Sequence, residues 1–100
     1  MPVAELRRKV SWEAVVEAAE KVRGAKWDDW RERHGDWGRD AAMHVAVRHG
    51  GMRLAEVVRA VKGIRYQAAA QAVKRFATSL EKDAARRKFV MELQRQLSIM

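Results

Sequence analysis

Apolar residues recur at intervals of three and four along most of this chain, which is the spacing of amphipathic helices. The first segment of this kind covers residues 12–23, with Ser11 as a suitable N-cap and Gly24 as a stop. Trp27 and Trp30 lie three positions apart and predict a short second helix. A basic loop is expected after it, with exposed Arg31, Arg33 and His34.

Two further amphipathic segments lie in the middle and at the end of the chain. Asp36 is a suitable cap for a third helix that ends at Gly50, and its alanines and valines are small enough for close packing. This helix is predicted to be central. Asp83 is expected to cap a last helix, whose apolar stripe is formed by Phe89, Val90, Leu93 and Leu97.

Between these segments, the chain from about residue 53 to residue 81 has the pattern of a helix-turn-helix. A short fourth helix is apolar at positions 54, 57, 58 and 61 and ends at Gly63, which can take the left-handed conformation of a sharp turn. The fifth helix, from about Tyr66 to Leu80, has an inward stripe of Ala69, Val73, Phe76 and Leu80. At about 100° per residue, its opposite face has Gln67, Gln71, Lys74, Arg75 and Thr78. The sequence thus predicts an all-α fold of five to six helices, in a single domain over residues 1–100.

The charge of the chain narrows the choice of partners. There are 21 lysines and arginines against 13 acidic residues, which gives a net charge of +8. Such an excess favours polyanions, so nucleic acid is the first candidate partner. No membrane partner is expected, because every strongly amphipathic helix is expected to pack its apolar side in the core. In addition, no apolar run approaches the roughly 20 residues that span a bilayer.

The cellular location follows from what the sequence lacks. There is no cysteine, which excludes disulfides and thiolate metal sites and fits a reducing compartment. The first ten residues are too charged for a secretory signal. We therefore expect a cytoplasmic protein that associates with the nucleoid.

The outward face of the fifth helix has side chains suited to reading DNA bases. Gln67 and Gln71 lie one turn apart, and glutamine pairs bidentately with adenine. Lys74 and Arg75 can reach guanine or phosphate, and Ala68 is small enough to contact a thymine methyl. From these residues alone, an ordinary solvated helix face is an equally good explanation.

The run from Gly38 to Phe76, GRDAAMHVAVRHGGMRLAEVVRAVKGIRYQAAAQAVKRF, resembles without gaps the C-terminal DNA-binding domain of the bacterial replication initiator DnaA. It is still more similar to the version of that domain at the C-terminus of some REP-associated tyrosine transposases. There the recognition helix typically has a tyrosine, an alanine two positions on, and an Ala-Val-Lys/Arg-Arg-Phe ending. Tyr66, Ala68 and the run from Ala72 to Phe76 match this pattern.

The resemblance, which extends more loosely from Ser11 to Leu97, implies a Trp-repressor-like helical fold. It also implies that the helix after Gly63 reads a major groove while the basic loop reaches the adjacent minor groove. Arg31 falls where the initiator family places its minor-groove arginine, with Arg33 as the near alternative. Pattern and resemblance together predict DNA contacts by Arg31, Arg33, Arg53, Arg65, Tyr66, Gln67, Ala68, Gln71, Lys74 and Arg75.

The chain departs from the initiator at the residues that read its replication-origin boxes. The initiator's Asp-His-Ser/Thr motif falls on Arg65, Tyr66 and Gln67, so two base-reading residue types are replaced and one charge is inverted. Those boxes are therefore not the expected target.

No catalytic function is predicted. The chain lacks the GxxxxGK phosphate loop of the initiator's ATPase and the paired histidines of the transposase's catalytic domain. Tyr66 is expected to contact DNA or to pack in the core rather than to act as a nucleophile. His44 and His49, five positions apart, are expected to project about 140° from each other, which is poor geometry for a shared metal. No cofactor or metal is predicted, and the four tryptophans are expected to pack in the core.

Two alternatives remain open. The chain can be a protein-interaction module on the same helical scaffold, with a basic face for an acidic partner and only non-specific affinity for DNA. It can also be the detached tail of an enzyme, whose catalytic domain is then fused upstream or supplied by a partner.

Overall fold

The computed structural model describes residues 9–99 and has six α-helices and no strand within that range. The helices are α1 (Trp12–Arg23), α2 (Trp27–Trp30), α3 (Gly38–Arg48), α4 (Leu54–Val61), α5 (Tyr66–Ser79) and α6 (Ala84–Gln96). The predicted all-α fold of five to six helices is therefore confirmed. In the described part of the chain, no helix has both the length and the apolar character needed to cross a membrane. The first eight residues, on which the prediction about a secretory signal depends, lie outside the described range.

Helix ends are fixed by the local signals that the sequence predicts. The Ser11 hydroxyl accepts the backbone N–H of Ala14 at 3.1 Å and so caps the start of α1. Gly24 ends the same helix in the left-handed conformation, with φ of 71°. At α6, the Asp83 carboxylate accepts the backbone N–H of Arg86 at 3.1 Å. All three predicted caps are confirmed.

The cap of α3 differs by one position from the prediction. The N-cap residue is Trp37, and Asp36 lies just before it. The Asp36 carboxylate accepts the N–H of Gly38, the first helical residue, at 2.7 Å, and pairs with Arg23 Nη1 at 2.7 Å. The N-cap position is therefore Trp37, while Asp36 provides the side-chain hydrogen bond to the first helical N–H, as expected of a cap residue. Burial alone raises the pKa of Asp36, but the hydrogen bonds from Arg23 and Gly38 outweigh burial, so the pKa is lowered.

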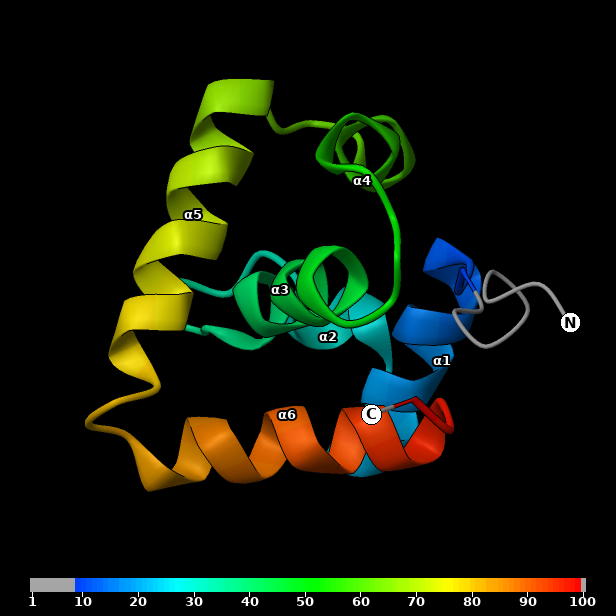
Figure 1. The fold of residues 1–100 in the computed structure, drawn as a ribbon, viewed down its shortest axis with the longest axis vertical. Coiled ribbons are helices and arrows are strands. Elements are labelled where there is room, and N and C mark those ends of the chain that lie inside the picture. The colour runs from blue at the N-terminus through cyan, green and yellow to red at the C-terminus, as the bar shows by residue number, and fades with distance from the viewer. Residues whose placement is uncertain (1–8, 100) are drawn as a thin grey trace, which may run out of the picture.

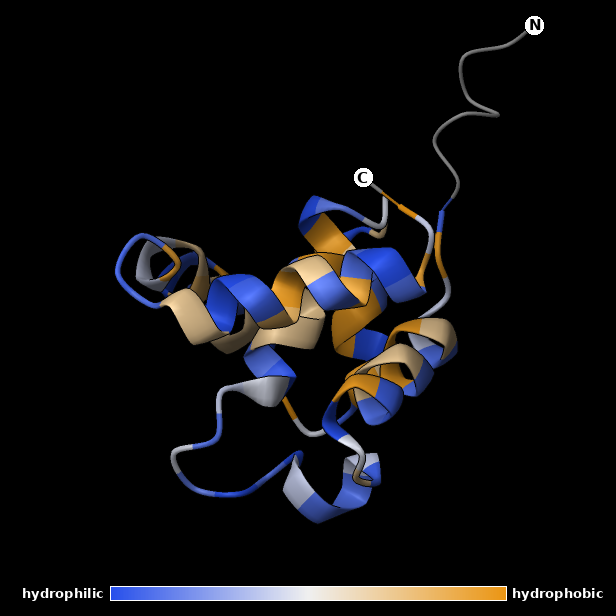
Figure 2. Cartoon of the chain, turned by 90° about the horizontal axis from the view of Figure 1, so that it is seen from below, coloured by the Kyte–Doolittle hydropathy of each residue, from blue (hydrophilic) through white to orange (hydrophobic). Residues whose placement is uncertain are grey.

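α3 is the central helix of the fold, and α1, α4, α5 and α6 all pack against it (Figure 1). Its residues 41–46 are all buried. Ala41, Ala42 and Ala46 have minimal side chains, so the neighbouring helices approach closely. The prediction of a central, tightly packed third helix is confirmed. In Figure 2, hydrophobic and hydrophilic residues alternate along each helix, as expected when one side of the helix faces a core.

The tryptophans form much of the remaining core. The ring centroids of Trp12 and Trp27 lie 5.5 Å apart, and those of Trp27 and Trp30 lie 4.7 Å apart, both in edge-to-face geometry. Trp37 is partly buried and packs edge-on against Phe89 at 5.4 Å. The predicted core role of the tryptophans is confirmed. α2 has only four residues, and the contact of Trp27 with Trp12 helps to join it to α1.

Gly38 permits the close contact between the start of α3 and α2. A Cβ at this position would lie 2.5 Å from Trp30 Cζ3 and 2.7 Å from Trp30 Cε3. Trp30 is only 1% exposed and has no room to move away. Gly38→Ala is therefore expected to lower the free energy of unfolding by about 1–3 kcal/mol, measured by urea denaturation. An unchanged unfolding midpoint would show that the two helices lie farther apart.

The two histidines of α3 lie closer together than predicted. The ring centroids of His44 and His49 are 5.6 Å apart. The expected separation of about 140° was wrong because His49 is the C-cap, with φ of −122° and ψ of −25°, and so lies outside the regular helix. His44 is buried, and its Nδ1 has no hydrogen-bond partner among residues 9–99. Burial first, and then the charges of His49 and Arg48, lower the pKa of His44 to about 4. Within the described range, no three His, Cys, Asp or Glu residues gather as metal ligands.

Candidate nucleic-acid interface

A tight turn joins α4 to α5. After α4 ends at Val61, two consecutive residues have positive φ: Lys62 at 60° and Gly63 at 76°. The predicted left-handed conformation of Gly63 is confirmed. α4 and α5 pack against each other, and apolar residues of both helices are buried: Val57, Val61, Ala69 and Val73. The helix pair is thus held in one arrangement.

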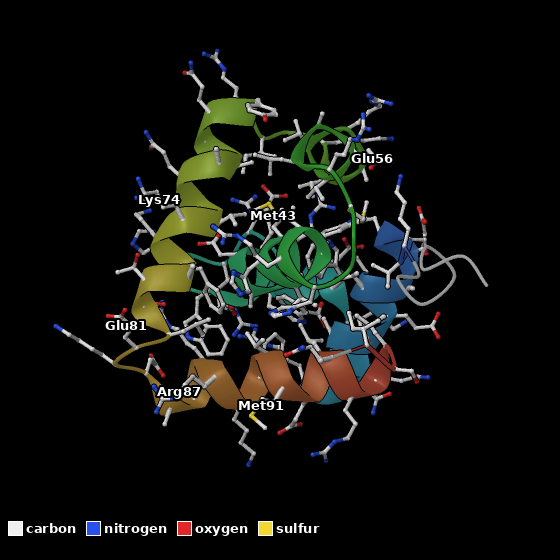
Figure 3. The ribbon with its side chains drawn as sticks, in the orientation of Figure 1. Met43, Glu56, Lys74, Glu81, Arg87 and Met91 are labelled. Carbon is white, nitrogen blue, oxygen red and sulfur yellow. The ribbon has the colours of Figure 1, made fainter. Side chains whose placement is uncertain are left out.

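α5 lies at one side of the molecule and presents a face to solvent along its length (Figures 1 and 3). The residues predicted to read DNA from this helix and its N-cap are all exposed: Arg65, Tyr66, Gln67, Ala68, Gln71, Lys74 and Arg75. Figure 3 shows Lys74 on the outer side of the helix, away from the core. Tyr66 is 55% exposed, so it lies at the surface and not in the core.

The exposed face of α5 has the dimensions and freedom of a reading surface. Gln67, Gln71 and Lys74 lie at positions i, i+4 and i+7 and so form one line along the helix. At 1.5 Å per residue, α5 is about 21 Å long, enough to lie in a major groove about 12 Å wide. Within residues 9–99, none of these three side chains, nor Arg65 or Arg75, takes part in an ion pair.

Arg31 and Arg33 do lie in or beside the predicted loop, but both have intramolecular partners. Arg31, whose side chain is 38% exposed, lies 3.6 Å from Asp28 and 3.2 Å from Glu32. Arg33 is more exposed and lies 3.7 Å from Asp36. The two pairs of Arg31 are with exposed carboxylates, and such pairs contribute about 0–1 kcal/mol each. The partner of Arg33, Asp36, is 4% exposed and also binds Arg23.

A hollow of about 210 Å³ connects this loop to the helix-turn-helix. Its lining includes Arg31, Arg39 from the first turn of α3, and Lys62 and Gly63 from the turn. Glu32 adds one carboxylate, so three cations and one anion surround the hollow. Arg39 and Lys62 were missed by sequence reasoning. The position of Lys62 directly before the turn glycine was an available signal, whereas nothing in the sequence indicates that Arg39 faces the turn.

Arg53 is exposed at the N-cap position of α4. Its backbone N–H donates to Glu56 Oε1 at 2.9 Å. Glu56 also pairs closely with Lys9, and the hydrogen bond from Lys9 is the main cause of its lowered pKa. The start of α4 is thereby tied to the segment that precedes α1.

Charge is distributed unevenly between the two sides of the molecule. From Lys62 to Leu80 there is no acidic residue, and the cations are Lys62, Arg65, Lys74 and Arg75. α1, on the opposite side from α5 in Figure 1, has Glu13, Glu17 and Glu20. The segment that contains α5 therefore has four cations and no acidic residue of its own.

Comparison with protein-family models, with curated proteins and with solved structures gave no match to this chain. The resemblance to the DNA-binding domain of DnaA and of the REP-associated transposases therefore stays a prediction from the residues quoted above. What bears on function directly is the geometry of α4, α5 and the loop that precedes α3.

Proposed function

We propose that this chain binds double-stranded or hairpin DNA in a sequence-specific manner through its helix-turn-helix, and catalyses no reaction itself. It would serve as a transposase-associated or replication-initiator-like recognition domain. The observation that supports this most is the exposed face of α5, where amide and cationic side chains lie in a line without ion-pair partners among residues 9–99.

Sequence readout is assigned to α5. With this helix in a major groove, Gln67 and Gln71 pair bidentately with adenines, and Lys74 contacts a guanine. Ala68, beside Gln67, allows a close approach and touches a thymine methyl. Tyr66 and Arg65, both exposed at the start of α5, add contacts at the groove edge.

Phosphate contacts fix the register of the helix. The strand that separates a major groove from the next minor groove would pass between α5 and the loop after α2, where the hollow offers Arg39 and Lys62. Arg31 and Arg33 enter the minor groove by exchanging their carboxylate partners for DNA. Arg53 and Arg75 bind phosphates on the flanks.

The experiment that tests this function is selection from a random library of duplex and hairpin DNA. A salt titration then compares the enriched sequence with a scrambled control. Enrichment of one motif, with much tighter binding than the control, supports a specific reader. If the two DNAs bind alike and are released together as salt rises, the net charge of +8 explains the binding. That result would favour the alternative of a protein-interaction module.

Gln71→Ala is expected to weaken binding to the selected site by about 1–3 kcal/mol and to relax specificity at one base pair. The reason is that the amide of Gln71 has no second role in the described structure, so its loss removes only a base contact. Binding to a series of base-substituted sites measures the effect. Gln96→Ala, at an exposed position of α6, is the matched control and should bind as the wild type does. Equal weakening on every sequence would contradict the assignment.

A further inference from the structure

A shallow groove lies between α1 and α4, away from the exposed face of α5. Trp12 and Val16 of α1 and Ala60 of α4 give it an apolar floor, and its volume is about 360 Å³. A second hollow of about 520 Å³ continues it toward Met52 and shares Trp12, Glu13 and Ala60. The groove exists because α1 and α4 both pack on α3 and leave a furrow between them.

The wall of the 360 Å³ groove is acidic in a basic protein, whereas its continuation toward Met52 also has Lys9 and Arg59. Glu13 and Glu20 lie at i−3 and i+4 from Val16, so both flank the apolar floor on the same face of α1. Glu17 adds a third carboxylate beside them. One oxygen of Glu20 accepts the backbone N–H of Trp27 at 2.7 Å, which fixes that carboxylate in place. Arg31 borders the groove at one end, where its own carboxylate partners offset its charge.

α6 presents the complementary pattern on its exposed face. Met91 is 61% exposed and is, with Tyr66, one of two large apolar residues exposed within residues 9–99. Lys88 and Arg95, both exposed, lie at i−3 and i+4 from Met91, which is the spacing of Glu13 and Glu20 around Val16. Figure 3 shows Met91 on the side of α6 that faces away from the rest of the molecule.

We propose that the chain associates with a second copy of itself, the exposed stripe of α6 in one copy lying in the groove between α1 and α4 of the next. Met91 fills the space over Val16 and Ala60, for which a flexible thioether side chain is well suited. In a parallel register, Lys88 faces Glu13 and Arg95 faces Glu20. Within one copy this contact is impossible, because Met91 faces away from the body of the molecule.

This self-association leaves α5 free, and of the residues proposed to contact DNA only Arg31 borders the groove. α5 lies on the opposite side of the molecule from α1 in Figure 1, and α6 lies along a third edge. When one of two linked copies has bound DNA, the other copy is held near a second site. It then binds that site at a raised effective concentration. The inference does not depend on the proposed function, because its test uses no DNA.

Sedimentation velocity at about 0.05 M and about 0.5 M salt tests the proposal, since screening weakens contacts between exposed charges. The wild-type chain is expected to exceed the monomer mass at low salt and to return to it at high salt. Glu13→Lys/Glu17→Lys and Lys88→Glu/Arg95→Glu should each weaken association at least about tenfold. The variants change only exposed side chains, and their helix content is checked by circular dichroism.

A mixture of the two variants is the decisive measurement. The first retains an intact α6 stripe and the second an intact groove, so an equimolar mixture should form 1:1 complexes although neither variant associates alone. Arg48→Glu/Lys82→Glu makes the same change in net charge as Lys88→Glu/Arg95→Glu, but at exposed positions outside both surfaces, and should associate as the wild type does. A wild-type chain that stays monomeric up to about 1 mM at low salt would overturn the proposal. So would a mixture that stays monomeric.

Discussion

Asp36→Ala is expected to lower the free energy of unfolding by about 3 kcal/mol, since it removes one partner of a largely buried ion pair. The Asp36 side chain is 4% exposed and binds Arg23, whose guanidinium lies 4.4 Å from the centroid of the Trp30 ring. Without the carboxylate, Arg23 keeps its charge in apolar surroundings. The backbone N–H of Gly38 also loses its acceptor.

Urea denaturation at neutral pH measures this effect, with Asp28→Ala as the matched control. Asp28 is 86% exposed and pairs only weakly, so its variant should unfold close to the wild type. Adding Arg23→Met to Asp36→Ala should recover part of the loss, because it removes the unpaired charge while keeping an apolar chain over Trp30. Equal midpoints for Asp28→Ala and Asp36→Ala would show that the pair is solvated in solution.

Acid is expected to destabilise the protein through His44. In the unfolded chain the imidazole binds a proton below its ordinary pKa of 6.5, whereas in the native state the pKa is lowered to about 4. Between these values the unfolded state binds more protons, so the free energy of unfolding falls as pH falls. The loss attributable to His44 should reach about 3 kcal/mol near pH 4. Asp36 affects stability at lower pH. Because its pKa is lowered, its stabilising contribution is lost only as the pH falls below the ordinary value of 3.8.

Urea denaturation at a series of pH values from neutral to about 4 measures the effect of His44. His44→Leu should flatten most of the slope, and the lowered pKa of His49 should account for a remainder of the same sign. His34→Gln, at an exposed position, is the control and should keep the wild-type slope. If His44→Leu also keeps that slope, another group is responsible.

Hydrophobic spacing and cap residues were sufficient to predict the helices. Ser11, Gly24 and Asp83 act within one turn of the backbone, so their roles follow from local sequence. The exposed and buried sides of α5 likewise follow from the angle between successive residues. These features depend on neighbours in the chain and not on how the helices are arranged.

Features that depend on distant contacts were not predictable in the same way. The ion pair of Asp36 with Arg23 joins residues 13 positions apart, so local sequence does not show it. The hollow that brings Arg39 close to Lys62 depends on how α3 and the turn pack together. The contact of His44 with His49 depends on the backbone leaving the helix at one residue, which the regular spacing does not show.

At Lys62 the backbone conformation lowers the stability of the fold, while the side chain adds a positive charge. With φ of 60° and ψ of 147°, it occupies a backbone region that side chains other than glycine rarely adopt, at a cost of about 1–3 kcal/mol. A sequence shaped for stability alone would have glycine here, as it has at the next position. The chain instead places Lys62 beside the hollow between the α4–α5 turn and the loop after α2. Lys62 thus adds a positive charge at the turn and lowers stability there. Replacing it with glycine would raise the stability and remove the charge.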